Sequence, residues 1–140
     1  MRRLPVPQSV LAAATVLLCA LGATACGTTT STAGFKGTEH EVAQTIADLQ
    51  SDVSAGEHKK ICERDLAAPV VTKLGGQKAC ETAVKNRVSE IDNTELQVES
   101  VKVDGNTATA RVKSVYEGKK RVRTVTLAKE GSRWKITAIA

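Results

Sequence analysis

This 140-residue sequence contains few of the side chains that most often carry chemistry. Its only aromatic residues are Phe35, Tyr116 and Trp134, which leaves little aromatic bulk for a core or a pocket. It has no C-x-x-C motif and no histidine at metal-ligand spacing, which argues against redox and zinc sites. No pair of acids or histidines has a spacing that would place both inward for proton transfer. The sequence therefore predicts no catalytic residues, no cofactor and no metal.

A long apolar run is also missing. The longest one, VLAAATVLLCAL at residues 10–21, is too short for a bilayer, which needs about 20 apolar residues. It follows a basic start with Arg2 and Arg3 and precedes the small residues GATAC. This order is typical of a secretory signal, which we predict over residues 1–25. The alternative is an N-terminal membrane helix, but no basic stop-transfer residues follow the run.

The end of this signal fits two processing routes. Ala23-Thr24-Ala25 is a small-x-small site for ordinary signal peptidase. Together with Cys26 it also resembles the bacterial lipobox, although Ala23 stands where that pattern usually has Leu. The resemblance implies diacylglycerol on Cys26 and cleavage just before it. Cys19 would be lost with the signal, so acylation of Cys26 leaves an even number of free cysteines.

The two remaining cysteines, Cys62 and Cys80, fall on predicted helices. In an exported chain such a pair predicts a disulfide bond, because disulfides persist outside the cytoplasm. A bridge across a loop of this length contributes about 3 kcal/mol in the chain-entropy description. We expect a protein held on the outer face of the bacterial plasma membrane through Cys26, or a secreted protein if Cys26 is not acylated.

The mature chain divides into a short tether and one domain. Residues 26–37 are rich in Gly, Thr and Ser and predict a flexible tether, followed by a domain over residues 38–140. Residues 38–90 carry seven basic and nine acidic residues, and residues 91–140 carry ten and six. This mild asymmetry excludes a nucleic-acid-binding footprint.

The first half of the domain predicts helices and the second half predicts strands. Thr38-Glu39-His40-Glu41 has the form of a capping box, and the apolar residues after it follow at helical spacing: Val42, Ile46, Leu49 and Val53. Further helices are predicted from about residue 57 and from about residue 77. Four alternating segments follow, with hairpin turns at Asp104-Gly105 and KEGS. The alternation slips near Glu99 and near Lys113, which predicts a β-bulge or bend at each place.

The densest charge run is Lys119-Lys120-Arg121-Val122-Arg123. One interpretation is contact with anionic headgroups or an anionic envelope polymer, with Lys119, Lys120, Arg121 and Arg123 as the contacting residues. The other is a solvated hairpin, or charges that keep an edge strand from pairing with its neighbours.

The motifs AGEHKKIC, VDGNTA and WKI, in this order of helices and strands, resemble the nuclear transport factor two-like superfamily. More narrowly, the chain is similar to small actinobacterial lipoproteins of that group. The resemblance implies an α+β fold, with three N-terminal helices packed in a curved, cone-shaped, four-stranded antiparallel sheet. It also implies a homodimer through the sheet face.

Some members of that superfamily are enzymes, such as steroid isomerases, with a pocket inside the cone. Because the sequence offers no inward acid or histidine pair, we expect a non-enzymatic, lipid-anchored binding or accessory module of the cell envelope. Its partner would be an envelope protein or an anionic polymer. The alternative is a small-molecule binder or an isomerase-like enzyme that uses the cone cavity.

Overall fold

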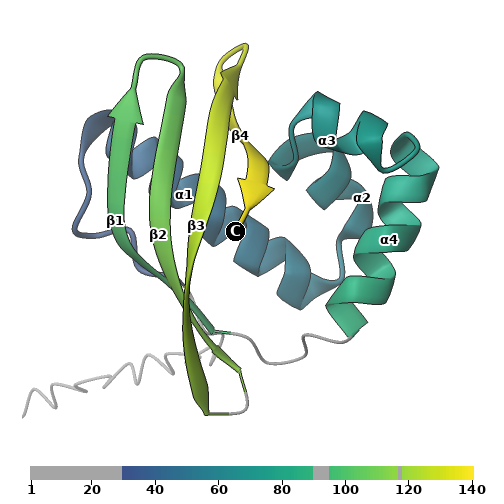
Figure 1. The fold of residues 1–140 in the computed structure, drawn as a ribbon, viewed down its shortest axis with the longest axis horizontal. Coiled ribbons are helices and arrows are strands. Elements are labelled where there is room, and N and C mark those ends of the chain that lie inside the picture. Colours follow the sequence, from purple (N-terminus) through teal and green to yellow (C-terminus); the bar gives the residue numbers. More distant parts are fainter. Residues whose placement is uncertain (1–29, 90–94, 117) are drawn as a thin grey trace, which may run out of the picture.

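The computed structural model describes residues 30–89, 95–116 and 118–140. The predicted signal peptide, Cys19, Cys26 and the start of the predicted tether lie outside these residues. The described chain is an α+β fold in which helices pack against one face of a four-stranded antiparallel sheet. Figure 1 shows this arrangement with the chain coloured from its N-terminus to its C-terminus.

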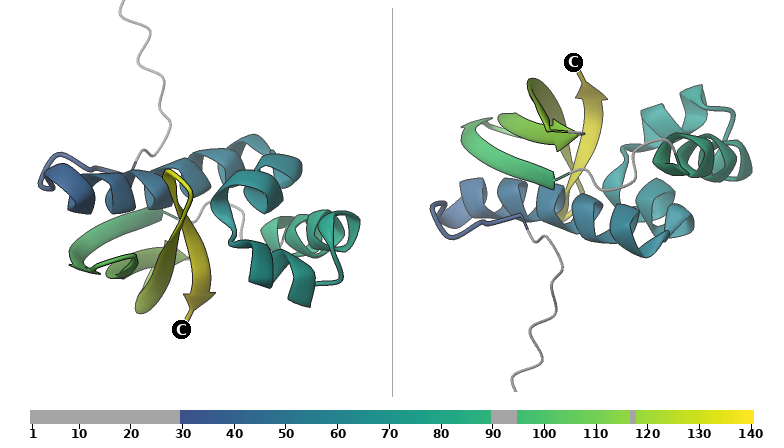
Figure 2. Two further views of the ribbon diagram at one scale, coloured as in Figure 1. Left: turned by 90° about the horizontal axis from the view of Figure 1, so that it is seen from above. Right: turned by 90° about the horizontal axis from the view of Figure 1, so that it is seen from below.

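The helices come first in the chain. They are α1 (Gly37–Ala55), α2 (His58–Lys60), the π-helical turn η1 (Ile61–Asp65), α3 (Ala68–Lys73) and α4 (Gln77–Ser89). The long α1 lies along one face of the sheet, and the shorter helices gather beside its C-terminal end (Figure 2). None of the helices in the described ranges is long and apolar enough to cross a membrane.

Helix α1 begins earlier than the capping-box prediction requires. The helix starts at Gly37, and its N-cap residue, Lys36, is extended and makes no side-chain cap. The capping-box prediction is therefore wrong, because Thr38 already lies inside the first turn. The helix ends at Ala55, and its C-cap residue Gly56 has a left-handed backbone (φ 69°) that favours glycine.

The strands form a simple meander. They are β1 (Glu95–Asp104), β2 (Thr107–Tyr116), β3 (Lys119–Glu130) and β4 (Arg133–Ile139), and their order in the sheet is their order in the chain. The first hairpin turn is Gly105-Asn106, one residue later than predicted, because Asp104 still pairs with Thr107. The second turn falls within the predicted KEGS segment, where Glu130 pairs with Arg133.

One of the two predicted bulges is present. The register between β1 and β2 shifts between Val98 and Ser100, which confirms the bulge near Glu99. Of the two alternatives near Lys113, the bulge is wrong, because β2 pairs with β3 in unbroken register from Thr107 to Tyr116. The inward row of β2 simply continues from Val112 to the small residue Ser114, which lines a pocket described below.

A second bulge lies where the sequence did not predict one. The register between β3 and β4 shifts between Thr126 and Leu127, so Thr137 is the extra residue on β4. Trp134 and Ile136 are buried, as the predicted alternation requires, but Ala138 is exposed because the bulge changes the face.

The main core lies between α1 and the concave face of the sheet. Its buried members are Val42, Ala43, Ile46, Val98, Ala108, Ala110, Val112, Val125, Leu127, Trp134 and Ile136. The helical end of the domain joins this core through β4, where the Ala67 N–H donates to the Ile136 carbonyl at 2.9 Å. The structure contains the Cys62–Cys80 disulfide, which connects η1 to α4, and both cysteines are buried.

Part of the predicted tether packs on the domain. Thr30 is only 8% exposed, and its hydroxyl donates to the Leu96 carbonyl at 3.1 Å. Phe35 is half-buried against the main core. The chain is therefore fixed to the domain from Thr30 onward, eight residues before the predicted domain start at Thr38.

Candidate functional site

A pocket of about 440 Å³ opens between α1, the tip of α4 and the concave face of the sheet. Pockets of about 300–1,000 Å³ are typical of small-molecule sites, so this one is large enough for a ligand. Most of its lining is aliphatic: Ile46, Leu49, Val53, Val88, Leu96, Val112, Val125, Ile136 and Ile139. The remaining lining residues are polar: Gln50, Ser114, Arg121 and Arg123.

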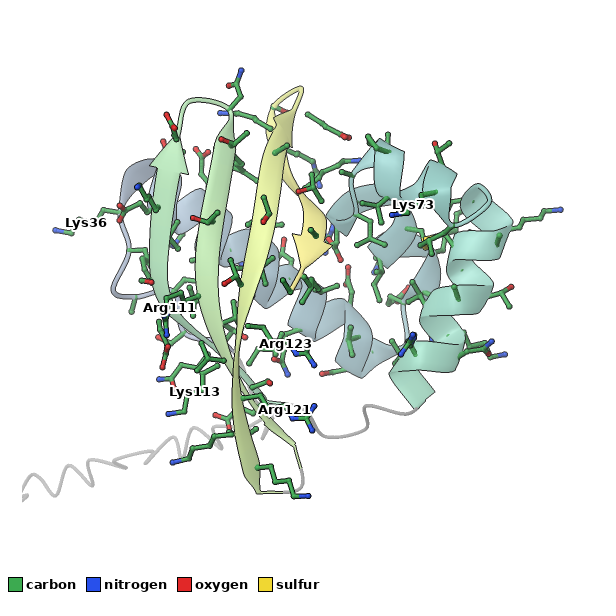
Figure 3. The ribbon with its side chains drawn as sticks, viewed as in Figure 1. Lys36, Lys73, Arg111, Lys113, Arg121 and Arg123 are labelled. Atoms are coloured by element: carbon green, nitrogen blue, oxygen red, sulfur yellow. A yellow bond between two sulfur atoms is a disulfide. The ribbon has the colours of Figure 1, made fainter. Side chains whose placement is uncertain are left out.

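The alternation of β3 brings the two arginines into this pocket. Val125 and Leu127 are buried on the concave face, and side chains two residues apart share a face, so Arg123 and Arg121 lie on that face as well. Their partners on β2 are Val112 and Ser114, which also line the pocket. Figure 3 shows Arg121 and Arg123 near each other at the lower end of β3, apart from Arg111 and Lys113 on β2.

Beside the two arginines, β3 extends beyond its pairing with β4. Thr124 exchanges two backbone hydrogen bonds of 2.9 Å with Ala140, and β4 has no residue opposite the segment 119–123. Arg121 and Arg123 are exposed to solvent and also line the pocket beside its aliphatic wall.

The mouth of the pocket is positively charged. Within the described ranges no carboxylate lies within ion-pair distance of Arg121 or Arg123, whereas Arg111 on β2 is paired with Glu99 at 4.0 Å. The described lining also contains no acid. An apolar cavity lined by two arginines that have no carboxylate partner among residues 30–89, 95–116 and 118–140 suits a ligand with an apolar body and an acidic group.

The predicted charge run divides between the two faces of the sheet. Lys120 and Val122 alternate with the arginines and lie on the convex face, where Val122 is 50% exposed. Lys119 is exposed at the start of β3. The four predicted cations therefore form no single surface, and only Arg121 and Arg123 line the pocket. Strand alternation counted in steps of two from Val125 and Leu127 would have placed Arg121 and Arg123 on the concave face. Nothing in the sequence indicated that Gln50 and Ser114 line a pocket.

A second group of charged side chains connects α1 to η1. The Arg64 Nη2 donates to Asp52 Oδ2 at 2.6 Å, and the Arg64 Nε donates to Asp65 Oδ1 at 3.1 Å. Asp65 is only 1% exposed, and its Oδ2 has no hydrogen-bond partner in the described part of the chain. Burial, opposed by Arg64 and reinforced by Asp52, raises the pKa of the Asp65 carboxyl from 3.8 to about 6. No motif or spacing in the sequence indicated this cluster.

Two further side chains that could carry function, Trp134 and His40, contact other residues of the domain. The Trp134 Nε1–H donates to Glu41 Oε2 at 3.2 Å, and the Lys129 ammonium lies 5.8 Å from the Trp134 ring centre, so this side chain packs rather than lines the pocket. His40 contacts Thr32 at 3.3 Å. Within residues 30–89, 95–116 and 118–140, no group of three His, Cys, Asp or Glu side chains could hold a metal ion. The Tyr116 side chain lies outside the described part.

Comparison with solved structures agrees with this fold. The "De novo designed NTF2 fold protein NT-9" is similar over 75% of this chain and 85% of its own, with a TM-score of 0.53 and 17% identity. A "Putative NTF2-like transpeptidase" from Campylobacter jejuni is similar over 66% and 94%, with a TM-score of 0.46 and 14% identity. A de novo designed protein with a curved β-sheet is similar over 46% and 61%, with a TM-score of 0.39 and 17% identity. The predicted α+β, nuclear transport factor two-like fold is thus confirmed.

Comparison at the level of sequence identifies a family. No curated protein matches the chain. A family profile described as "Putative lumazine-binding" matches residues 69–139, which include α4, the whole sheet and both pocket arginines. Because this match spans half of the 140 residues, the chain belongs to the family described as "Putative lumazine-binding".

Proposed function

We propose that this chain is an exported, lipid-anchored module that binds a small molecule with an apolar body and an acidic group. The observation that carries the proposal is the aliphatic pocket with Arg121 and Arg123 at its mouth. The wall supplies non-directional apolar burial, and the two guanidinium groups supply charge-assisted hydrogen bonds that fix one end of the ligand.

The described lining favours binding over catalysis. Proton transfer needs a carboxyl or imidazole group within hydrogen-bond reach of the substrate, and the described lining holds neither. The buried acid with a raised pKa, Asp65, contributes to a different cleft beside Trp134 and not to this pocket. An isomerase-like enzyme is therefore the less supported alternative.

The family description names a class of ligand that needs a direct test. A lumazine has a flat ring system, which aromatic side chains commonly hold by stacking. No aromatic side chain belongs to the described lining, which is aliphatic. The pocket therefore favours a flexible apolar body over a flat ring, and lumazine is the comparison ligand in the experiment below.

Export and anchoring rest on the N-terminal sequence. The signal over residues 1–25 and the lipobox-like segment ending at Cys26 support a lipoprotein on the outer face of the plasma membrane, like the small actinobacterial lipoproteins that the chain resembles. The buried Cys62–Cys80 disulfide is consistent with an oxidising compartment. Contact with an envelope protein, an anionic polymer or a second copy of the chain stays a prediction.

Intact mass spectrometry of the membrane-extracted protein tests the anchor. We expect a mature chain that begins at Cys26 and carries the added mass of a diacylglycerol group. A Cys26→Ser variant should lose that mass and leave the membrane fraction, because the anchor is then missing. A wild-type chain recovered from the medium without added mass would show that it is secreted instead.

Calorimetric titration with two matched ligands tests the pocket. Dodecanoate should bind more tightly than dodecan-1-ol, because only the carboxylate can pair with Arg121 and Arg123. The double substitution Arg121→Met and Arg123→Met should weaken dodecanoate binding about tenfold or more, since each hydrogen bond to a charged group contributes about 1.5–3 kcal/mol. Binding of dodecan-1-ol should change little.

Lys120→Met is the matched control. It removes a cation from the same segment of β3 but on the convex face, so dodecanoate affinity should stay at the wild-type value. Equal losses in this control and in the double variant would mean that net charge and not the pocket determines binding. If the protein bound lumazine more tightly than dodecanoate, its ligand would be a flat ring and not the flexible apolar molecule proposed.

A further inference from the structure

The described chain begins at the wall of the pocket. The Thr30 hydroxyl donates to the Leu96 carbonyl at 3.1 Å and lies 3.5 Å from Gln50 Oε1. The Gln50 Oε1 in turn accepts a hydrogen bond of 2.7 Å from the Leu96 N–H. Because Leu96 and Gln50 both line the pocket, these bonds fix the N-terminal segment directly against the outside of its wall.

This attachment limits the distance between the pocket wall and the anchor. Only four residue steps separate Cys26 from Thr30, and a fully extended chain covers at most about 3.3–3.6 Å per residue. The four residue steps between Cys26 and Thr30 can therefore span at most about 14 Å. A lipid on Cys26 would hold the pocket at the surface of the bilayer, whereas a free tether through residue 37 would allow the domain to move farther away.

We propose that the occupant of the pocket is an anionic lipid of the membrane to which the chain is anchored. One acyl chain lies along the aliphatic wall, and the acidic headgroup lies against Arg121 and Arg123. This inference rests on the proposed function, which it narrows from any acidic amphiphile to a lipid of that membrane.

The charge at the mouth distinguishes this occupant from the lipid on Cys26 itself. A diacylglycerol group in thioether linkage is neutral, so its ester oxygens accept hydrogen bonds but offer no negative charge to pair with two guanidinium groups. A phosphate headgroup accepts bidentate hydrogen bonds from arginine, and two arginines about 7 Å apart on one strand face can share it. Charge complementarity therefore favours a separate, anionic lipid.

The size of the pocket agrees with one chain. A volume of about 440 Å³ lies in the lower part of the usual range for ligand sites, about 300–1,000 Å³. The open end beyond β4 would leave the second acyl chain of a phospholipid in the bilayer.

Photo-crosslinking in vesicles tests the inference. The full, lipid-bearing chain is reconstituted in phosphatidylcholine vesicles that contain a minor fraction of phosphatidylglycerol with a diazirine in one acyl chain. After irradiation we expect lipid adducts on the peptides that carry Leu49, Val53 and Ile139. The same diazirine in phosphatidylcholine should label these peptides about tenfold less, a ratio that corresponds to about 1.4 kcal/mol of headgroup preference.

Matched variants connect the labelling to the arginines and to the anchor. Arg121→Met with Arg123→Met should lower labelling by phosphatidylglycerol to the level of phosphatidylcholine, and Lys120→Met should leave it unchanged. Cys26→Ser should lose the pocket adducts in vesicles and still bind dodecanoate in solution.

The outcomes separate the two proposals. If the pocket binds dodecanoate in solution but gives no phosphatidylglycerol adducts in vesicles, the membrane-lipid inference is overturned and the proposed function stands. If dodecanoate does not bind either, both fail. Equal labelling by the two phospholipids, or undiminished labelling of Cys26→Ser, also overturns the inference, because the headgroup or the anchor would then have no role.

Discussion

Replacement of both Cys62 and Cys80 by alanine is expected to lower the free energy of unfolding by about 3 kcal/mol. The two residues are 18 positions apart, and closing a loop of this length restricts the unfolded chain by that order of energy. The loss is a large fraction of the stability of a small domain, which is about 5–15 kcal/mol in total.

The structure locates this effect at α4. Cys80 is the only side chain of this helix in the described part that is fully buried, while Val84 and Val88 are only half-buried. Without the disulfide, the helix would be held mainly by these partial contacts. We therefore expect the amide hydrogens of α4 to exchange faster in the double variant, while those of the sheet lose protection only to the extent that global stability falls.

Urea unfolding and hydrogen exchange measure the two parts of this prediction. Reduction of the wild-type protein should produce nearly the same loss as the double substitution, which makes it an internal control. A loss below about 1 kcal/mol, with unchanged exchange in α4, would mean that packing alone holds the helix.

Asp65→Asn is expected to stabilise the protein at neutral pH by about 3 kcal/mol. The pKa of Asp65 is raised by burial to about 6, from 3.8, so its ionised form is the unfavourable one in the folded state. A tenfold change in the affinity of the carboxylate for a proton corresponds to about 1.4 kcal/mol of free energy. Asparagine keeps the shape of the side chain, removes the charge that burial disfavours, and offers an N–H donor toward Asp52.

The sign of the pH dependence follows from the same raised pKa. Between pH 4 and pH 6 the folded state binds more protons at Asp65 than the unfolded state does. The stability of the wild-type protein due to this group is therefore highest below pH 4, falls as pH rises through 6, and stays low above it. The Asp65→Asn variant should lack this decline.

Urea unfolding at pH 4, 5, 6 and 7.5 compares the two proteins. Asp48→Asn is the control, because its carboxylate is 41% exposed and lies 3.9 Å from Arg64, so it should change stability by less than about 0.5 kcal/mol. A destabilised Asp65→Asn at pH 7.5 would show that the ion pair with Arg64 outweighs the cost of burying the charge.

The structural features that could be predicted from the sequence are those that depend on side-chain periodicity and turn chemistry. The bulge at Glu99 was visible because two apolar residues three positions apart cannot share a strand face. The same argument failed at Lys113, because the concave face accepts a small polar residue, Ser114, where it borders a pocket and not a packed core. Periodicity identifies faces, but it does not show whether a face is packed or hollow.

Other features depend on contacts between distant segments. Thr30 belongs to a stretch whose composition is typical of a tether, and its hydrogen bond to Leu96, 66 residues away, fixes it to the domain. Asp65 is buried because η1 turns it toward α1, where Arg64 and Asp52 meet. No local pattern contains this information, since the partners are brought together by the packing of helices.

The order of the strands also bears on how the chain reaches its native state. Every strand pairs with its neighbour in sequence, so each ladder closes a short loop at a small cost in chain entropy. Contacts between α1 and β4 close much longer loops. The Thr45 hydroxyl, for example, donates to the Trp134 carbonyl, 89 residues away. The contacts between α1 and the sheet therefore carry the greatest loop-closure entropy, and the pocket between α1 and the sheet exists only when these contacts are formed.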